Sequence, residues 1–308
     1  MRARPLVLVL ALVTAACSGG GQKPESGGSG PSNNPPSEAG DVPSELADLE
    51  LIFSGEDGTY VARADGSEVR KAFDLEDIWE FQADVSPDGK RVALRADEEP
   101  PRGGTWLIGI GANEALNLTQ KAGLRGGAAD WSPDGRSLVL TGKREDESHF
   151  GLWVVRTDGS SARRITPASW EAQYPAWSPD GNLIAFTKVV PPDDFELYVI
   201  SPDGTGLRQV TQSDGYDNYA AWSPDGKQLV FSREHVDKSG LWLINLDRSG
   251  ERFLTQGGEP QWEPGRWIIF DCALGSEARV RGCVISPDGS GLTELPIDEQ
   301  VSFPNWLP

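Results

Sequence analysis

The chain repeats one short turn sequence at nearly constant intervals. Three copies read Trp-Ser-Pro-Asp-Gly, and a fourth has Val in place of Trp. Two degenerate copies keep little more than the Trp. The residues at the Trp position are Val85, Trp131, Trp177, Trp222, Trp262 and Trp306. Successive copies are therefore 46, 46, 45, 40 and 44 residues apart. A period of about 40–45 residues with apolar strands between turns is typical of β-propeller blades.

Each repeat is predicted to contain four strands. In the clearest copy the strands cover residues 129–132, 137–141, 151–156 and 162–166. In the first turn, Pro presets φ and Gly accepts a positive φ at the exit. A second Asp-Gly turn recurs between the third and fourth strands, at Asp65, Asp158, Asp203 and Asp288. We interpret both turn families as hairpin turns rather than as catalytic or calcium-binding loops.

The two ends of the repeat region complement each other. Residues 49–73 supply three strands but no Trp-Ser-Pro-Asp-Gly strand, whereas residues 302–308 supply that strand alone. Pairing the two would remove an open sheet edge. We therefore predict an all-β fold over residues 49–308, a six-bladed β-propeller of four-stranded blades closed by pairing of the N- and C-terminal strands.

The order of these elements resembles the WD-like repeat of TolB and of the propeller domains of prolyl oligopeptidases. The shared pattern is Pro/Ala-x-Trp-Ser-Pro-Asp-Gly, an apolar strand, a strand with an aromatic residue, an Asp-Gly turn and a Leu-Thr ending. It covers residues 49–308. TolB itself has an N-terminal α/β domain that residues 18–48 cannot form, and prolyl oligopeptidases add a hydrolase domain. The resemblance thus implies the propeller, but neither Tol–Pal function nor peptidase activity.

The N-terminal region is predicted to direct export. Arg2 and Arg4 precede an apolar run over residues 5–16, which is too short to span a bilayer, and Cys17 follows. This pattern resembles a bacterial lipoprotein signal peptide over residues 1–16, with Cys17 as the lipidated residue. An ordinary secreted protein is the alternative. Residues 17–48 are predicted to be a Gly/Ser/Pro-rich disordered tether, so we expect a lipid-anchored, extracytoplasmic location in the cell envelope or periplasm.

The cysteine count predicts a disulfide, and the net charge limits the kinds of partner. Cys272 and Cys283 are predicted to form a disulfide, since an even pair remains in an oxidising compartment; two small buried apolar residues are the alternative. Without residues 1–16 the chain has 26 Lys and Arg against 47 Asp and Glu, a net charge of −21. Such a charge repels phosphate backbones. We expect a monomer that binds no nucleic acid and meets the membrane only through its anchor.

No catalytic residue, cofactor or metal is predicted. The chain has two histidines, His149 and His235, and lacks a Gly-x-Ser-x-Gly elbow, a phosphate-binding loop and a zinc motif. The histidines are expected to be ordinary loop residues; a metal shared between them is the lesser alternative. Acidic pairs such as Glu98-Glu99 are too abundant to indicate a site.

The loops suggest where binding occurs. Strand alternation places both Asp-Gly turn families on one face and the long, irregular connections on the other, and binding residues usually lie on variable loops. Candidate partner-binding residues on this irregular face are Asp77, Trp79, Trp170, Tyr174, Asp193, Asp194, Tyr216 and Tyr219. These aromatic residues could instead cap blade edges.

The favoured function is binding of an envelope protein, peptide or glycan through the irregular face. The alternative is a polysaccharide lyase or glycosidase that uses acidic residues at the channel mouth. A tight cluster of titratable groups with shifted pKa in one concave site would favour the enzyme.

Overall fold

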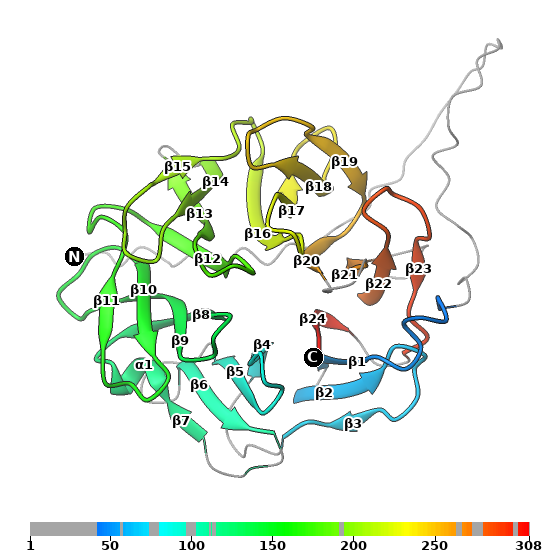
Figure 1. Ribbon diagram of the computed structural model, residues 1–308, viewed down its shortest axis with the longest axis horizontal. Helices are drawn as coiled ribbons and strands as arrows, with labels where there is room; N and C mark the ends of the chain where they lie inside the picture. The colour runs from blue at the N-terminus through cyan, green and yellow to red at the C-terminus, as the bar shows by residue number, and fades with distance from the viewer. Residues whose placement is uncertain are drawn as a thin grey trace, which may run out of the picture. The chain divides into compact units, whose positions relative to one another are not determined.

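The computed structural model describes residues 42–55, 58–73, 80–96, 103–110, 112, 115–190, 194–262, 267–272, 280–297 and 301–307. All of them belong to one compact unit, residues 35–308. The elements in these residues are 24 strands and one four-residue helix, α1 (Leu118–Lys121). The fold is an all-β propeller, in which the sheets follow one another around a ring (Figure 1).

Four of the sheets have four strands each. The first contains β24 (Ser302–Trp306), β1 (Glu50–Gly55), β2 (Gly58–Arg63) and β3 (Arg70–Lys71). The second contains β4 (Glu80–Val85), β5 (Arg91–Ala96), β6 (Gly104–Gly109) and β7 (Ala115–Asn117). The third contains β8 (Arg125–Trp131), β9 (Ser137–Lys143), β10 (Gly151–Arg156) and β11 (Ala162–Arg164). The fourth contains β20 (Gly258–Trp262), β21 (Ile268–Cys272), β22 (Arg281–Ile285) and β23 (Thr293–Glu294).

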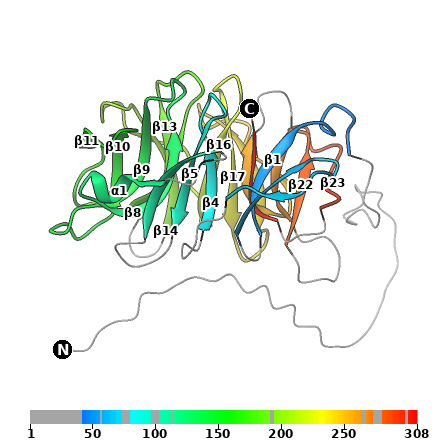
Figure 2. The ribbon, with the colours of Figure 1, turned by 90° about the horizontal axis from the view of Figure 1, so that it is seen from below.

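The fifth sheet has eight strands and joins two meanders. One meander is β12 (Ala172–Trp177), β13 (Ile184–Val190), β14 (Asp194–Ile200) and β15 (Arg208–Gln209). The other is β16 (Tyr216–Trp222), β17 (Gln228–Glu234), β18 (Gly240–Asn245) and β19 (Arg252–Thr255). Figure 2 shows β4, β16 and β17 running along the axis of the ring, so that the connections lie at its two faces.

The join between the two meanders differs from the expected separate four-stranded blades. Strands β14 and β16 pair in parallel through Phe195 and Tyr216. The rings of these residues also meet edge to face, with centroids 5.3 Å apart. The connection between β15 and β16 is held by Glu196, which accepts hydrogen bonds from Thr211 Oγ1 at 2.6 Å and from the Ser213 N–H at 2.7 Å. The parallel bridge arises because this connection is tied back to β14.

The two ends of the described propeller meet in one sheet. Strand β24 pairs antiparallel with β1, with Leu51 opposite Trp306. The Leu307 N–H extends the ladder by donating to the Glu50 carbonyl at 2.9 Å. The C-terminal strand thus covers the inner edge of β1, which would otherwise present unpaired backbone groups.

The core lies between neighbouring sheets and is built from the second strand of each meander. These strands carry an aromatic or leucine side chain with no exposed surface at equivalent positions, Phe53, Leu94, Leu140, Phe186, Phe231 and Phe270. Burying a side chain of this size stabilises the fold by about 1.5–3 kcal/mol. The apolar second strands predicted from the sequence are therefore the main source of packing energy.

The Ser-Pro-Asp-Gly segments form hairpin turns, as predicted. In each of the four good copies the Ser Oγ donates to the Asp carboxylate at 2.7 Å, in the pairs Ser86–Asp88, Ser132–Asp134, Ser178–Asp180 and Ser223–Asp225. These hydrogen bonds lower the pKa of the aspartates, since they favour the charged carboxylate. The repeated aspartate therefore stabilises a turn.

The structure contains the disulfide between Cys272 and Cys283. It links neighbouring strands β21 and β22, with the two Cα atoms 5.8 Å apart. This separation is within the usual range for a disulfide.

Removal of residues 302–308 is predicted to destabilise the whole ring, because it strips β24 from β1 and exposes a sheet edge. We expect a lower melting temperature and concentration-dependent association, measured by calorimetry and light scattering. A truncated chain that melts like the full one and stays monomeric would contradict the structural role of this strand.

Candidate ligand site in the central channel

A β-bulge occurs at the same place in the inner strand of every meander. The pairing of each inner strand with its neighbour shifts register just before the Trp position. At this point five non-glycine residues have φ near +50°, namely Gln82 (52°), Tyr174 (50°), Tyr219 (52°), Glu259 (51°) and Phe303 (50°). Non-glycine residues seldom adopt such angles, and they concentrate at functional sites. Each stands three positions before the Trp position of its repeat, which Val85 occupies in the first copy, and the bulge re-aims its side chain.

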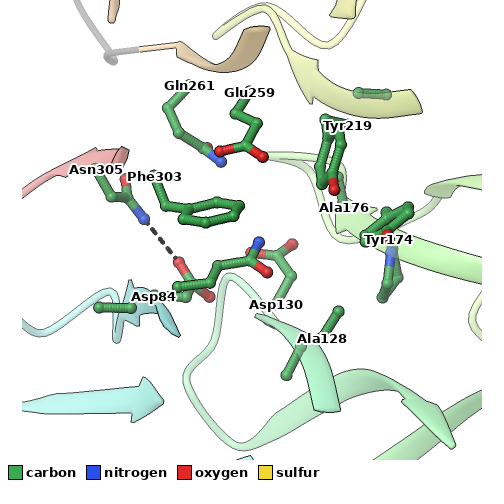
Figure 3. Close-up of a pocket in the computed structure, with 15 residues that line it drawn as sticks. Asp84, Ala128, Asp130, Tyr174, Ala176, Tyr219, Glu259, Gln261, Phe303 and Asn305 are labelled. Atoms are coloured by element: carbon green, nitrogen blue, oxygen red, sulfur yellow. Dashed lines mark hydrogen bonds between the residues drawn. The ribbon is translucent and has the colours of Figure 1, made fainter. Parts of the chain in front are cut away.

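The bulge residues line a cavity in the centre of the ring. Its volume is about 60 Å³, and its walls come from the inner strands β4, β8, β12, β16, β20 and β24 (Figure 3). This is room for about four water molecules. Sites that enclose drug-sized molecules measure about 300–1,000 Å³. The cavity can therefore hold a small group, but it cannot enclose a sugar unit.

One wall carries a pair of aspartates. Asp84 accepts hydrogen bonds from the Trp131 N–H and from Asn305 Nδ2, both at 3.0 Å, and Asp130 accepts from the Trp177 N–H. Burial raises the pKa of both groups, that of Asp130 to about 6 and that of Asp84 further, because Asp130 lies beside it. The raised pKa values of this adjacent pair favour the protonated carboxyls over the charged ones.

A second acidic pair consists of Glu259 and Asp271, of which Glu259 lies on the opposite side of the Phe303 ring from Asp84 in the view of Figure 3. Burial raises the pKa of Glu259 to about 7, an effect partly offset by its hydrogen bond to Asp271 and by the charge of Arg95. Burial and the charge of Glu259 raise the pKa of Asp271. Asp271 also accepts a hydrogen bond from the Phe303 N–H at 3.1 Å. Of the two carboxyls, that of Glu259 lines the cavity.

Two oxygen atoms of the lining lack a hydrogen-bond donor. Gln82 Oε1 and Glu259 Oε2 are buried, and neither has a partner within the part of the chain that the structure describes. A buried acceptor without a donor costs about 1–3 kcal/mol. Both oxygens belong to bulge residues that line the cavity. A donor in the cavity would therefore be favourable.

Aromatic rings form the remaining wall. The ring centroids of Tyr174 and Tyr219 are 4.3 Å apart. Burial raises the pKa of Tyr219 well above its ordinary value, so this hydroxyl stays protonated. The cavity thus combines carboxyls with aromatic surface.

The residues predicted to bind a partner lie in different parts of the structure. Tyr174 and Tyr219 were expected on loops of the irregular face, but they lie in β12 and β16 and face the channel, because those strands begin earlier than predicted. Trp170 packs edge to face on Tyr198 at 6.1 Å, beneath Lys188, whose Nζ is 3.7 Å from its ring centroid. This packing matches the edge-capping alternative.

Other predicted residues lie elsewhere. Asp194 begins β14, where its carboxylate accepts a hydrogen bond from the Phe195 N–H at 2.8 Å. Asp77, Trp79, Asp193 and Cys17 lie outside the described residues. The candidate residues that the structure describes therefore lie in different places, and Asp77, Trp79 and Asp193 stay a prediction.

Tyr216 remains exposed on the irregular face, with 43% of its surface accessible. Val236, in the connection after β17, is 96% exposed, and Tyr216 pairs with Glu234 at the end of that strand. The Tyr216 patch is defined here as Asp194, Phe195, Asp214, Tyr216, Glu234, Val236 and Asp237. It combines exposed apolar groups with acidic ones.

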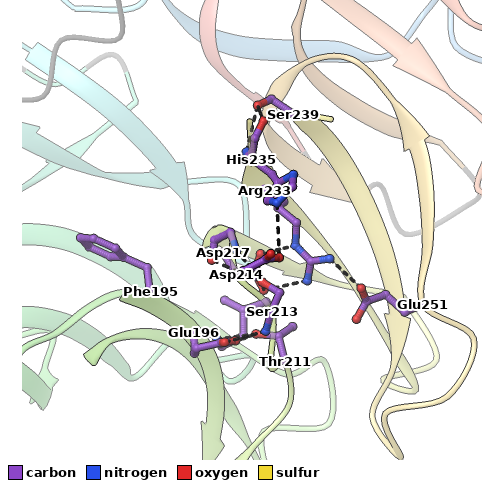
Figure 4. Close-up of polar contacts among 12 residues, drawn as sticks. Phe195, Glu196, Thr211, Ser213, Asp214, Asp217, Arg233, His235, Ser239 and Glu251 are labelled. Carbon is purple, nitrogen blue, oxygen red and sulfur yellow. Dashed lines mark hydrogen bonds and ion pairs between the residues drawn. The ribbon is translucent and has the colours of Figure 1, made fainter. Parts of the chain in front are cut away.

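A buried ion network supports this patch (Figure 4). Arg233 Nε donates to Asp217 Oδ1 at 2.6 Å, and its Nη1 donates to Glu251 Oε1 at the same distance. The side chains of Arg233 and Asp217 are only 6% and 0% exposed. Asp217 directly follows Tyr216, so the network fixes the start of β16.

The two histidines contact separate acidic partners. His149 Nδ1 is 3.5 Å from Glu171 Oε2, and His235 Nε2 is 3.3 Å from Asp214 Oδ1. Among the described residues, no group of three or more His, Cys, Asp and Glu side chains could hold a metal ion. The shared-metal alternative gains no support.

The acidic cavity was missed from the sequence. Its residues stand one or three positions before the Trp residues, where the repeats differ most from one another. The only available signal was this irregularity inside an otherwise regular repeat, since the aspartates could equally have faced solvent.

The comparison with known proteins establishes the family. Residues 59–308 match the family model described as the TolB beta propeller domain. The chain belongs to this family. TolB from Acinetobacter baumannii is similar in structure, with a TM-score of 0.71 and 18% identity over 85% of this chain and 67% of that protein.

Two further similarities are more limited. An oligogalacturonate lyase from Vibrio parahaemolyticus has a TM-score of 0.56 and 12% identity over 77% of this chain and 70% of its own. The uncharacterized peptidase YuxL of Bacillus subtilis is 29% identical over 107 residues, which is 33% of this chain and 16% of YuxL. The chain thus spans a small part of that relative, and the structural likenesses show the fold alone.

Within the described residues, no helix has the length and apolar character needed to cross a membrane.

Replacing Glu259 with Gln is predicted to change how stability depends on pH. The folded pKa of about 7 exceeds the ordinary 4.5, so the folded state binds the proton more tightly and wild-type stability falls as pH rises through this window. Glu259→Gln removes that loss. We expect its stability relative to wild type to be about 1–3 kcal/mol better at pH 8 than at pH 5, measured by urea unfolding.

A turn aspartate provides the control of opposite sign. The Ser132 hydroxyl and the Arg136 N–H lower the pKa of Asp134, so Asp134→Asn should lose stability at neutral pH and recover relative to wild type in acid. An identical pH dependence in Glu259→Gln and wild type would contradict the assignment of a raised pKa.

Proposed function

We propose that the protein is a lipid-anchored, extracytoplasmic interaction protein that binds a basic protein partner through the irregular face of its propeller. We infer that each four-stranded meander acts as one blade, which gives six, and that the protein is a monomer. The single observation that supports the binding role most is the Tyr216 patch, in which exposed apolar side chains stand on a buried ion network.

The patch has the properties of a contact anchor. Tyrosine presents a large, amphipathic surface, and such residues dominate the energy of many interfaces. The contact with Phe195 and the bridge to β14 hold Tyr216 in place, while the Asp217–Arg233 ion pair prevents the strand from shifting. Little conformational freedom would be lost on binding, so more of the contact energy remains as affinity.

Charge indicates the kind of partner. The patch carries the four acidic residues Asp194, Asp214, Glu234 and Asp237, and the whole chain has a net charge of −19. A negative field accelerates association with basic surfaces and disfavours acidic ones. This favours a basic protein segment over a neutral glycan.

Site-specific photocrosslinking tests the binding face. A photoreactive amino acid at position 216 should capture one defined envelope protein in intact cells, whereas the same residue at Asp158, in a turn on the other face, should not. With that partner purified, Tyr216→Ala should weaken binding by about 2 kcal/mol and Asp158→Ala should not. Added salt should slow association. Equal crosslinking from both positions, or binding that Tyr216→Ala and salt leave unchanged, contradicts the proposal.

The anchor is tested separately. We propose that residues 1–16 are removed as a lipoprotein signal peptide, that Cys17 is lipidated, and that residues 17–48 tether the propeller of residues 49–308. Cys17→Ser should move the protein from the membrane fraction to the soluble fraction, because one amino acid carries the whole attachment. A variant that still sediments with membranes would show that lipid is not the tether.

An enzymatic role on polysaccharide is the second candidate, and one observation favours it. Four carboxyls with raised pKa meet at the channel, a pattern typical of acid–base sites. The volume of about 60 Å³ argues against it, since a glycosidic bond must enter between two sugar units. Cleavage of polygalacturonate that Glu259→Gln abolishes would establish the enzyme in place of the binding protein.

A further inference from the structure

We infer that the channel cavity binds a single cationic group, an ammonium or guanidinium, and that this group belongs to the partner. The inference rests on the proposed function, because it assumes that a partner covers the irregular face. It adds a second contact that is recessed in the channel and separate from the Tyr216 patch.

The polar atoms of the cavity favour a donor as ligand. Glu259 Oε2 and Gln82 Oε1 are buried acceptors with no donor among the described residues. The Asp84 and Asp130 carboxyls line the same space. An ammonium group offers three donors and a guanidinium five, with no acceptor in either. A cationic donor would therefore satisfy the orphaned oxygens, whereas an anion or a carbonyl would meet only further acceptors.

The aromatic lining has the same preference. The rings of Tyr174, Tyr219 and Phe303 border the cavity, and aromatic faces attract cations, with ammonium bound in aromatic cages as the best-known use. A neutral apolar group would also contact these rings, but it would leave the carboxyls and the two orphaned oxygens without donors.

Size limits the ligand to the charged end of a longer chain. About 60 Å³ accommodates about four water molecules, which is comparable to an ammonium or guanidinium head. The source of the head can be a lysine or arginine side chain or the N-terminus of the partner.

Charge balance predicts that binding is coupled to proton release. The groups that face Glu259 or share its cavity are Asp84, Asp130, Asp271, Arg95, Tyr174 and Tyr219. Arg95 supplies one positive charge against four carboxyls. Without a ligand the carboxyls are partly protonated near neutral pH; a cation stabilises their charged forms, so affinity should rise between about pH 5 and pH 8.

Titration with small probes tests the inference directly. The probes are Nα-acetyl-lysine methylamide, Nα-acetyl-arginine methylamide and alanine methylamide, which present a side-chain ammonium, a guanidinium and an α-ammonium. Nα-acetyl-norleucine methylamide is the neutral control. Nuclear magnetic resonance shifts should show saturable binding of at least one cationic probe at pH 8, with a dissociation constant on the order of 1–10 mM, and about tenfold weaker binding of the control. The preferred cationic probe identifies the source of the head group.

Variants locate the site. Glu259→Gln should raise the dissociation constant of the preferred probe by about fivefold or more. Probe binding by this variant should also change less with pH than probe binding by wild type. Tyr219→Phe keeps the ring and serves as a second, mild variant that should still bind. Asp158→Asn neutralises a carboxylate in an outer turn and should bind like wild type. Calorimetry in buffers of different ionisation enthalpy should show proton release on binding.

The inference fails if no cationic probe binds saturably, if norleucine binds equally well, or if Glu259→Gln and wild type bind alike. These results leave the proposed function untouched, because partner capture at position 216 is a separate measurement. Conversely, probe binding that depends on Glu259 together with no partner captured at position 216 would place a cation site in the channel and remove the partner-binding face.

Discussion

The convergence of the inner strands on one axis is the constraint on which the rest of the structure depends. Neighbouring sheets approach most closely there, and little volume is available for side chains. Two positions before the Trp position of each repeat the chain therefore carries only small or compact residues, Ala83, Ala129, Pro175, Ala220, Pro260 and Pro304. The next residue towards the N-terminus lies in the bulge and turns its side chain into the channel. Closure by β24 and β1 keeps this arrangement in register.

Convergence also explains the chemistry of the cavity. On an outer turn, hydrogen bonds from the Ser132 hydroxyl and the Arg136 N–H lower the pKa of Asp134, whereas burial on an inner strand raises the pKa of Asp130. Residue type is identical in the two cases. Position relative to the axis decides whether an aspartate stabilises a hairpin or lines a recessed site with a raised pKa.

The junction between β14 and β16 links the channel to the irregular face. Tyr216 starts the strand that carries Tyr219, and between them Asp217 is fixed by Arg233. A partner on the Tyr216 patch and a cation in the cavity would thus contact opposite ends of one short, rigid segment. Tyr216 is exposed, whereas Tyr219 faces the channel because it lies in the bulge, which re-aims its side chain.

The sequence by itself determined the repeat, the strand order and the turns. These follow from local rules: period, apolar runs, and Pro and Gly angles. For Cys272 and Cys283 the sequence left a disulfide and two small buried apolar residues as alternatives, and the structure contains the disulfide. Only the tertiary structure decided which polar residues meet. Asp84 and Asp130 are 46 residues apart in the chain, and Glu259 reaches the same cavity from another sheet. The sequence pattern predicts Tyr174 and Tyr219 in loops, because no local sequence signal marks a bulge formed by non-glycine residues. The burial that raises the pKa of the channel carboxyls is a property of the closed ring, and no single repeat contains it.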